Sequence, residues 1–214
     1  MTEISPSAAR GAGAALIASG VIYFAAEFIA AAAWTDPPYS YTYHFISDLG
    51  VRGPATVFGQ DVYSPLARVM NAGLFLFGLA ALTGVILLRG LPGRRRWATV
   101  AAAALLAAGS IVVALFPGSD DSGSSDYHGL GAFLAFVAGN ALVILLGRAG
   151  QLLGVPRRLG RTLVQLGILG LVSLAAFGAL RASGTGVLLG LFERGVIYPF
   201  LIGFIVVGAA LRRA

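Results

Sequence analysis

Six long runs of apolar residues are the feature that most limits what this chain can fold into. Each run is long enough to cross the hydrocarbon core of a bilayer as a helix, which takes about 20 residues. Hydrophobic residues make up 57% of the 214 residues and charged residues 11%, unlike the balance of a water-soluble domain. The sequence therefore predicts an all-α polytopic membrane protein, a single bundle of six transmembrane helices. We place the spans near residues 11–34, 66–89, 97–117, 128–147, 162–181 and 188–211.

Positive charge falls unevenly on the two sides of the predicted bundle. All 15 basic side chains are arginine, and the larger set lies in one group of connections and chain ends. Segments rich in positive charge stay in the cytoplasm, so we expect both termini to be cytoplasmic. Most acidic residues fall on the opposite, outer side. The cytoplasmic set is Arg10, Arg89, Arg94, Arg95, Arg96, Arg148, Arg157, Arg158, Arg161, Arg212 and Arg213, and the outer set is Arg52, Arg68, Arg181 and Arg194.

Composition also excludes some partners and ligands. Membrane topology accounts for the net charge of +6, so it does not indicate a nucleic-acid partner, and membrane lipids are the expected surroundings. The chain has no cysteine, which excludes disulfides and thiolate ligands. Abundant Ala, Gly and Arg without Lys indicate a GC-rich bacterial genome. We therefore expect a multi-pass protein of the cytoplasmic (inner) membrane of a bacterium.

The densest group of reactive side chains lies in the long outer connection between the first two spans. Residues 43–50 read Tyr-His-Phe-Ile-Ser-Asp-Leu-Gly, and we expect a short surface helix near 43–49 that ends at Gly50. In such a helix His44, Ser47 and Asp48 would share one face. We expect the tyrosines before it to lie at the membrane interface. A connection of this length usually carries function or its own structure.

The two histidines of the chain fall at outer ends of predicted spans. His44 has Asp48 one helical turn away, and His128 follows a loop that contains Asp120. Imidazole and carboxylate groups suit a divalent metal such as zinc, with an open position for water. We therefore name His44, Asp48, Asp120 and His128 as candidate metal ligands. The alternative is a hydrogen-bonded network that fixes the loops, because no compact H-E-x-x-H spacing is present.

Two further residues are candidates for catalysis. Ser47 could act as a nucleophile beside His44 and Asp48, although no G-x-S-x-G elbow exists. Glu193 opens the sixth span, where a carboxylate suits the helix N-terminus or could move protons. The remaining candidates are polar residues within or at the ends of spans, for which ion pairing or interhelical hydrogen bonding is the alternative to a functional role. They are Glu27, expected either to pair with Arg194 or Arg68 or to be protonated and hydrogen-bonded within the bundle, together with Asn71, Asn140 and Arg194.

Several motifs, in order along nearly the whole chain, resemble the bacterial domain-of-unknown-function 998 family. The resemblance implies six spans and a polar centre at the outer face, without an assigned reaction. That family is distantly similar to the Frag/DRAM/Sfk membrane proteins, whose members are implicated in lipid handling. The motifs are H-F-I-S-D-L-G at 44–50, S-P-x5-N at 64–71, F-P-G-S-D at 116–120, H-G-x-G-A-x-x-A-F at 128–136, G-N at 139–140 and E-R-G-V-I-Y-P at 193–199.

A looser similarity exists to membrane hydrolases of the alkaline ceramidase type, which use Ser, Asp and three His at a zinc. This chain has two histidines and lacks a paired-His helix. We expect a lipid-handling membrane protein with a polar, candidate metal-binding site at the outer face. In its enzyme version a metal would assist hydrolysis of a lipid ester or amide. The alternatives are a non-enzymatic lipid or small-molecule binding or transport protein, or a structural partner subunit.

Overall fold

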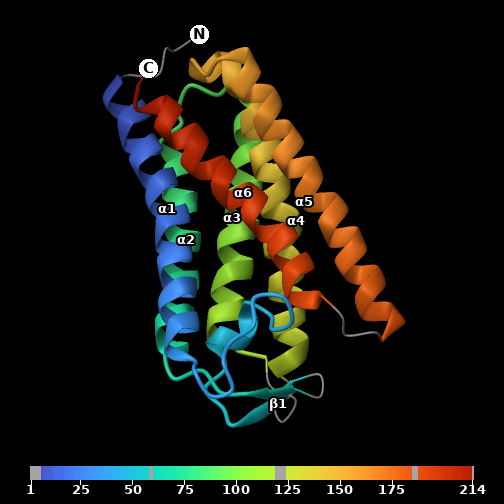
Figure 1. Ribbon diagram of the computed structural model, residues 1–214. Helices are drawn as coiled ribbons and strands as arrows, with labels where there is room; N and C mark the ends of the chain where they lie inside the picture. Colours follow the sequence, from blue (N-terminus) through green and yellow to red (C-terminus); the bar gives the residue numbers. More distant parts are fainter. Residues whose placement is uncertain (1–5, 58–59, 119–123, 185–187, 214) are drawn as a thin grey trace.

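A bundle of long helices forms the protein in the computed structural model, which describes residues 6–57, 60–118, 124–184 and 188–213 (Figure 1). Six helices of the described residues are long and apolar enough to cross a membrane, which confirms the predicted fold class. Two short 3-10 helices and one hairpin complete the described elements. The helices are α1 (Pro6–Ala33), α2 (Ala67–Leu87), α3 (Gly93–Leu115), α4 (Ser124–Ala149), α5 (Arg157–Ser183) and α6 (Leu189–Leu211), with η1 (Ser47–Gly50), η2 (Gly150–Leu153), β1 (Ala55–Val57) and β2 (Gln60–Val62).

Several helices extend beyond the apolar runs that predicted them. α5 begins at Arg157, five residues before the predicted span, and α3 begins at Gly93 and includes three consecutive arginines. Arginine has a high helix propensity, so a charged end lowers hydropathy without ending the helix. The apolar runs therefore located the part of each helix that can lie in lipid rather than its full length.

The bundle has two distinct ends. α1 begins and α6 ends at one of them, which we call the terminal end, and segment 34–66 lies at the other, which we call the loop end (Figure 1). α1 to α4 pack in sequence order, and α6 closes the group by packing against α1 and α4. α5 packs against α4 and α6 and diverges from α4 toward the loop end. It also buries the smallest share of its span, 22% against 44–61% for the others.

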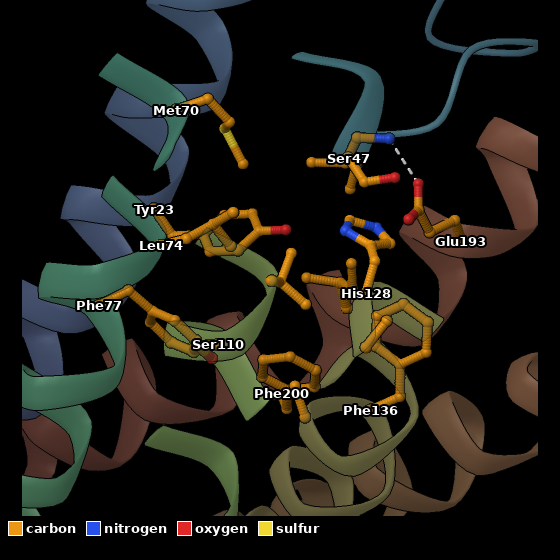
Figure 2. A pocket seen from close by; sticks show the side chains of 15 residues that line it. Tyr23, Ser47, Met70, Leu74, Phe77, Ser110, His128, Phe136, Glu193 and Phe200 are labelled. Atoms are coloured by element: carbon orange, nitrogen blue, oxygen red, sulfur yellow. Dashed lines mark hydrogen bonds between the residues drawn. The ribbon is translucent and has the colours of Figure 1, made fainter. Parts of the chain in front are cut away.

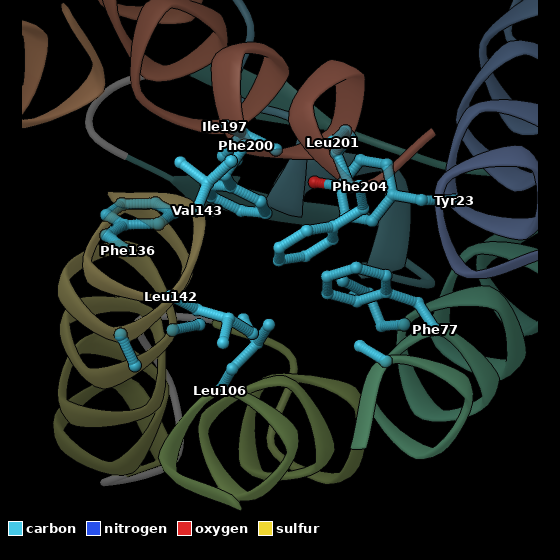
Figure 3. Close-up of a cluster of buried hydrophobic side chains, with 14 of the residues drawn as sticks. Tyr23, Phe77, Leu106, Phe136, Leu142, Val143, Ile197, Phe200, Leu201 and Phe204 are labelled. Atoms are coloured by element: carbon cyan, nitrogen blue, oxygen red, sulfur yellow. The ribbon is translucent and has the colours of Figure 1, made fainter. Parts of the chain in front are cut away.

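Aromatic and branched side chains fill the centre of the bundle. Figure 3 shows Tyr23 from α1, Phe77 from α2 and Leu106 from α3 pointing toward Phe200 and Phe204 of α6. Close packing supplies the stabilisation here, because lipid is as apolar as the protein interior.

Small residues bring neighbouring helices into direct contact. A Cβ added at Gly109 of α3 would clash with the backbone at Gly131 and Ala135 of α4, and one at Gly139 would meet the ring of Phe200. Gly109 therefore lets α3 and α4 approach to backbone distance, and Gly139 makes room on α4 for a ring of α6.

Segment 34–66 differs from the expected surface helix near 43–49. The structure has a four-residue 3-10 helix, Ser47–Gly50, in which Asp48, Leu49 and Gly50 are buried. The Asp48 side chain accepts a hydrogen bond of 2.8 Å from the Phe45 amide, and this local contact competes with α-helical hydrogen bonding. The hairpin follows, with Ala55 opposite Val62 in an antiparallel register. The short 3-10 helix thus packs into the end of the bundle, while Tyr41, Tyr43 and Tyr63 of the segment remain exposed.

Candidate functional site

A buried ion pair joins the first and last helices. Nη2 of Arg194 lies 3.0 Å from Oε1 of Glu27, and the two side chains are 7% and 0% exposed. Tyr198, one helical turn after Arg194, donates a hydrogen bond of 2.9 Å to the same oxygen. The structure therefore confirms the expected pairing of Glu27 and gives Arg194 as its partner. A charge buried in a span is costly unless it is paired in this way.

Arg194 also binds the loop that crosses over it. Its Nη1 group donates to the carbonyl oxygens of Tyr41 at 2.7 Å and His44 at 3.2 Å, and Nη2 donates to the hydroxyl of Tyr39. Tyr39 in turn donates to the carbonyl oxygen of Phe45 at 2.9 Å. We call Glu27, Arg194, Tyr198 and Tyr39 the clamp. It ties α1, α6 and the loop together through a guanidinium whose donors are used by protein acceptors.

His44 lies against the clamp rather than on a face shared with Ser47 and Asp48. Its ring stacks on Trp34 and Tyr39, with centroids 5.0 Å and 5.3 Å apart. The Ser40 amide donates to His44 Nδ1 at 2.9 Å. Burial, followed by the charge of Arg194, lowers the pKa of His44, so the ring is neutral at pH 7 and only Nε2 is left for another ligand.

A separate cavity of about 860 Å³ opens next to the clamp at the loop end. We call it the loop-end cavity. Its polar lining consists of Ser47 and Asp48 of η1, His128 of α4 and Glu193 of α6, together with the charged side chains of Asp126 and Arg181. Its other walls are apolar, and they come from the loop, α4 and α5: Phe45, Leu130, Phe133, Phe136, Leu174 and Phe177.

The polar groups converge from elements that are far apart in sequence. Figure 2 shows Ser47, His128 and Glu193 around a smaller adjoining hollow, with the hydroxyl of Tyr23 pointing toward the same space from α1. Glu193 is held by a hydrogen bond from the Ile46 amide, so it fixes η1 while it faces the hollow. A carboxylate, a hydroxyl and an imidazole therefore border one hollow.

Asp48 has an altered titration because of its position. Burial raises its pKa from 3.8 to about 7, although the Phe45 amide and the charge of Arg194 act in the opposite direction. An acid with a pKa near neutrality can exchange protons at the pH at which a cell works. Asp48 is therefore suited to general acid or base chemistry, and its sequence context gave no sign of this shift.

The ring of His128 is oriented by the loop before α4. Its Nδ1 lies 2.8 Å from the carbonyl oxygen of Phe116 and 3.1 Å from the amide nitrogen of Gly118. The shorter contact favours an Nδ1–H group that donates to Phe116, which is a common way to fix a histidine tautomer. This tautomer leaves Nε2 as an acceptor for a proton or a metal.

Comparison with protein-family models decides where the chain belongs. The model described as "Protein of unknown function (DUF998)" matches residues 16–210. The chain belongs to the DUF998 family. The match includes all but the first residues of α1 and the last of α6, and it confirms the resemblance carried by the motifs. The search of curated proteins found no match, and the search of solved structures found none.

Three of the motifs that carry the DUF998 resemblance meet at the loop end. The 44–50 motif supplies Ser47 and Asp48 to the cavity, the 128–136 motif supplies His128, and the 193–199 motif supplies Glu193 to the cavity and Arg194 to the clamp. Asp120, the fourth candidate metal ligand, lies outside the described residues. Within the described ranges no three His, Asp or Glu side chains form a group that could hold a metal. The four-ligand metal site thus stays a prediction.

The two asparagine candidates make interhelical contacts. Asn71 of α2 donates to the carbonyl oxygen of Gly50 at 2.9 Å, and Asn140 of α4 donates to that of Val196 at 3.0 Å. Both contacts fit the hydrogen-bonding alternative given for these residues.

Sequence reasoning missed the part played by two tyrosines. Tyr39 was expected at the membrane interface, but its hydroxyl links Arg194 to Phe45. Tyr198 was not singled out, although it lies four residues after Arg194 and so on the same helical face. The spacing of Tyr198 was a usable signal, whereas Tyr39 depends on a loop path that no local pattern specifies.

Proposed function

We propose that this DUF998 protein binds an amphiphilic lipid in the loop-end cavity. The polar head would lie against Ser47, Asp48, His128 and Glu193, and the apolar part would lie between α4 and α5. The observation that carries this proposal is the joining of a polar end to apolar walls in one cavity of about 860 Å³. On the predicted topology this site faces the outer leaflet.

The divergence of α5 supports entry from the membrane. α4 and α5 touch near the terminal end, where a Cβ at Gly147 would meet the carbonyl oxygen of Gly160 at 2.6 Å. Toward the loop end they separate, and Phe133, Leu174 and Phe177 line the space between them. A lipid tail matches such a lateral, aromatic-lined opening.

The contrast with the clamp argues against a purely structural network. Arg194 and Glu27 use each other and nearby protein groups as partners. Ser47, Asp48 and His128, by contrast, border open volume. A polar group placed beside a cavity is the usual arrangement for orienting a ligand.

Photolabelling of the purified full chain tests lipid binding. The probe is phosphatidylethanolamine with a diazirine in its acyl chain, in nanodiscs of phosphatidylcholine. We expect saturable labelling of peptides that contain Leu174 or Phe177. Gly178→Phe should reduce it at least tenfold, because Gly178 lines the cavity and a Cβ there meets nothing within 4 Å.

Leu76→Phe is the matched control, since it adds the same ring at an exposed position on α2 and should leave labelling unchanged. Labelling that does not saturate, or that survives Gly178→Phe, would count against the proposal.

A second candidate function, hydrolysis of a lipid ester or amide, is favoured by the orientation of His128. Nε2 could accept a proton from water as the water oxygen bonds to the carbonyl carbon, and the proton would then pass to the leaving group. Asp48 or Glu193 could assist this transfer. If a divalent metal binds, His128 and Asp48 are the described residues that would hold it, and the metal would supply an activated water.

Release of fatty acid from short-chain phospholipid or N-acyl substrates tests this version. His128→Ala should abolish turnover and Ser47→Ala should distinguish a serine nucleophile from direct attack by water. Elemental analysis of protein prepared without chelator tests the metal, whose loss in His128→Ala is expected. If the wild-type protein shows neither turnover nor bound metal, hydrolysis is rejected and lipid binding alone remains the proposed function.

A further inference from the structure

A groove at the terminal end gathers arginine side chains from two helices. It has a volume of about 560 Å³ and lies where α4 passes through η2 into α5. Arg148 lines it from α4, Arg157 and Arg161 line it from α5, and Gln151 and Gln165 complete its polar lining. Every charged side chain that lines it is a cation, and the glutamines can also donate hydrogen bonds.

These charges are not compensated by the protein around them. Across residues 6–57, 60–118, 124–184 and 188–213, none of Arg148, Arg157 and Arg161 makes a side-chain hydrogen bond or an ion pair. The first turn of α5 has no acidic residue, and Pro156 before it offers no side-chain cap. The free N–H groups and the positive end of the helix dipole therefore add to the arginine charge.

Membrane topology explains why arginines occur at this end but not why three of them border one hollow. Arg158 follows Arg157 in sequence and does not line the groove. The groove floor is formed where Gly147 and Gly160 bring the two helices together. This packing brings Arg148 of α4 to the same groove as Arg157 and Arg161 of α5, so that the three could contact one anion.

One face of α5 runs from the groove onto the apolar surface of the bundle. Arg157, Arg161 and Gln165 are four residues apart, and Ile168 and Val172 follow at spacings of three and four. Residues so spaced share a helical face. Ile168 and Val172 are 51% and 61% exposed, so an acyl chain could lie along α5 directly beyond the cationic groove.

We propose that this groove binds the phosphate headgroup of an anionic membrane lipid, with its tail along Ile168 and Val172. The guanidinium groups would donate charge-assisted hydrogen bonds to the phosphate oxygens. The site is separate from the loop-end cavity and does not depend on the function proposed for it. The continuous polar-to-apolar face favours a lipid over free phosphate, which would use the arginines alone.

Native mass spectrometry of the full chain in detergent, titrated with dioleoylphosphatidylglycerol, tests this site. We expect Arg157→Gln with Arg161→Gln to weaken binding of the lipid at least tenfold, and Arg148→Gln alone to weaken it about threefold, because charge-assisted hydrogen bonds are lost. The matched control is Arg94→Gln with Arg95→Gln, which removes the same charge from exposed positions at the start of α3. It should change the affinity less than twofold.

A parallel calorimetric titration with inorganic phosphate distinguishes a lipid phosphate headgroup from free phosphate as the bound anion. Weak phosphate binding beside strong, arginine-dependent lipid binding supports the proposal. Equal effects of the two double variants, or no saturable binding of the lipid, would overturn it. Phosphate binding that needs Arg157 and Arg161 without any lipid binding would overturn the lipid assignment. Thermal unfolding should be unchanged in all variants, and Gly178→Phe should leave this site intact.

Discussion

The clamp and the loop-end cavity meet at consecutive residues of α6, yet they use polar groups in opposite ways. Arg194 belongs to the clamp and donates hydrogen bonds to Glu27, Tyr39 and backbone carbonyl oxygens. Glu193 faces the cavity, with Asp48, Ser47 and His128 around it. In an apolar chain, a polar residue therefore indicates a position with a structural or a functional role. The groups that surround the residue determine whether it stabilises the fold or contacts a ligand.

Removing the clamp cation should produce the largest effect. We expect Arg194→Ala to lower the free energy of unfolding by about 3–5 kcal/mol, because it leaves the Glu27 carboxylate buried without its partner. Thermal unfolding in one fixed detergent measures the change. Arg68→Ala removes an exposed arginine and should change stability by about 0.5 kcal/mol or less. An Arg194→Ala protein as stable as wild type would contradict the structural role assigned to the clamp.

The close contact between α6 and the loop should give a smaller effect. A Cβ at Gly190 would clash with the carbonyl oxygen of His44, whose position the clamp fixes. We therefore expect Gly190→Ala to cost about 1–3 kcal/mol, the range for overpacking a close contact.

Gly178→Ala makes the same change within α5, where an added Cβ meets nothing within 4 Å, and it should be neutral or slightly stabilising. Similar unfolding temperatures for the two variants would show that the loop can move away from α6.

The smallest expected effect is the change in stability between pH 6 and pH 7 that comes from Asp48 in the cavity. The folded state holds the Asp48 proton more tightly than the unfolded state, since its pKa is raised from 3.8 to about 7. The stability that this group adds is complete below about pH 4 and is lost as pH rises through 7, at about 1 kcal/mol between pH 6 and pH 7.

Asp48→Asn should flatten this part of the stability curve while its amide oxygen still accepts from Phe45. The charged groups near Asp48 that remain in this variant are Glu193 and Arg194, together with Asp126 and Arg181 in the lining of the same cavity. An unchanged slope would show that Asp48 is ionised in the folded protein.

The sequence predicted the fold well because its strongest signals are local. Each span needs only a run of apolar residues, and the bundle follows from their number and from small residues such as Gly109 and Gly139. Ser47, Asp48, His128 and Glu193 were named as candidates because reactive side chains are rare in this chain, and the structure places all four around one cavity.

The sequence could not predict which candidates would meet. Helical spacing predicted that His44 would share a face with Ser47 and Asp48. In the structure Ser47 and Asp48 belong to a 3-10 helix that begins at Ser47, and His44 lies outside it. Its ring then stacks on Trp34 and Tyr39 along a loop path fixed by Arg194. The cavity itself results from the angle between α4 and α5, which is a property of tertiary packing.

A crystal structure of the protein grown in a lipidic mesophase would test the central claim most directly. We predict elongated density between α4 and α5, with its polar end within hydrogen-bonding distance of His128 or Ser47 and with the Glu27–Arg194 pair unchanged. A cavity closed by movement of α5 onto α4, or a ligand that replaces Glu27 as the partner of Arg194, would contradict the separation of the cavity from the clamp.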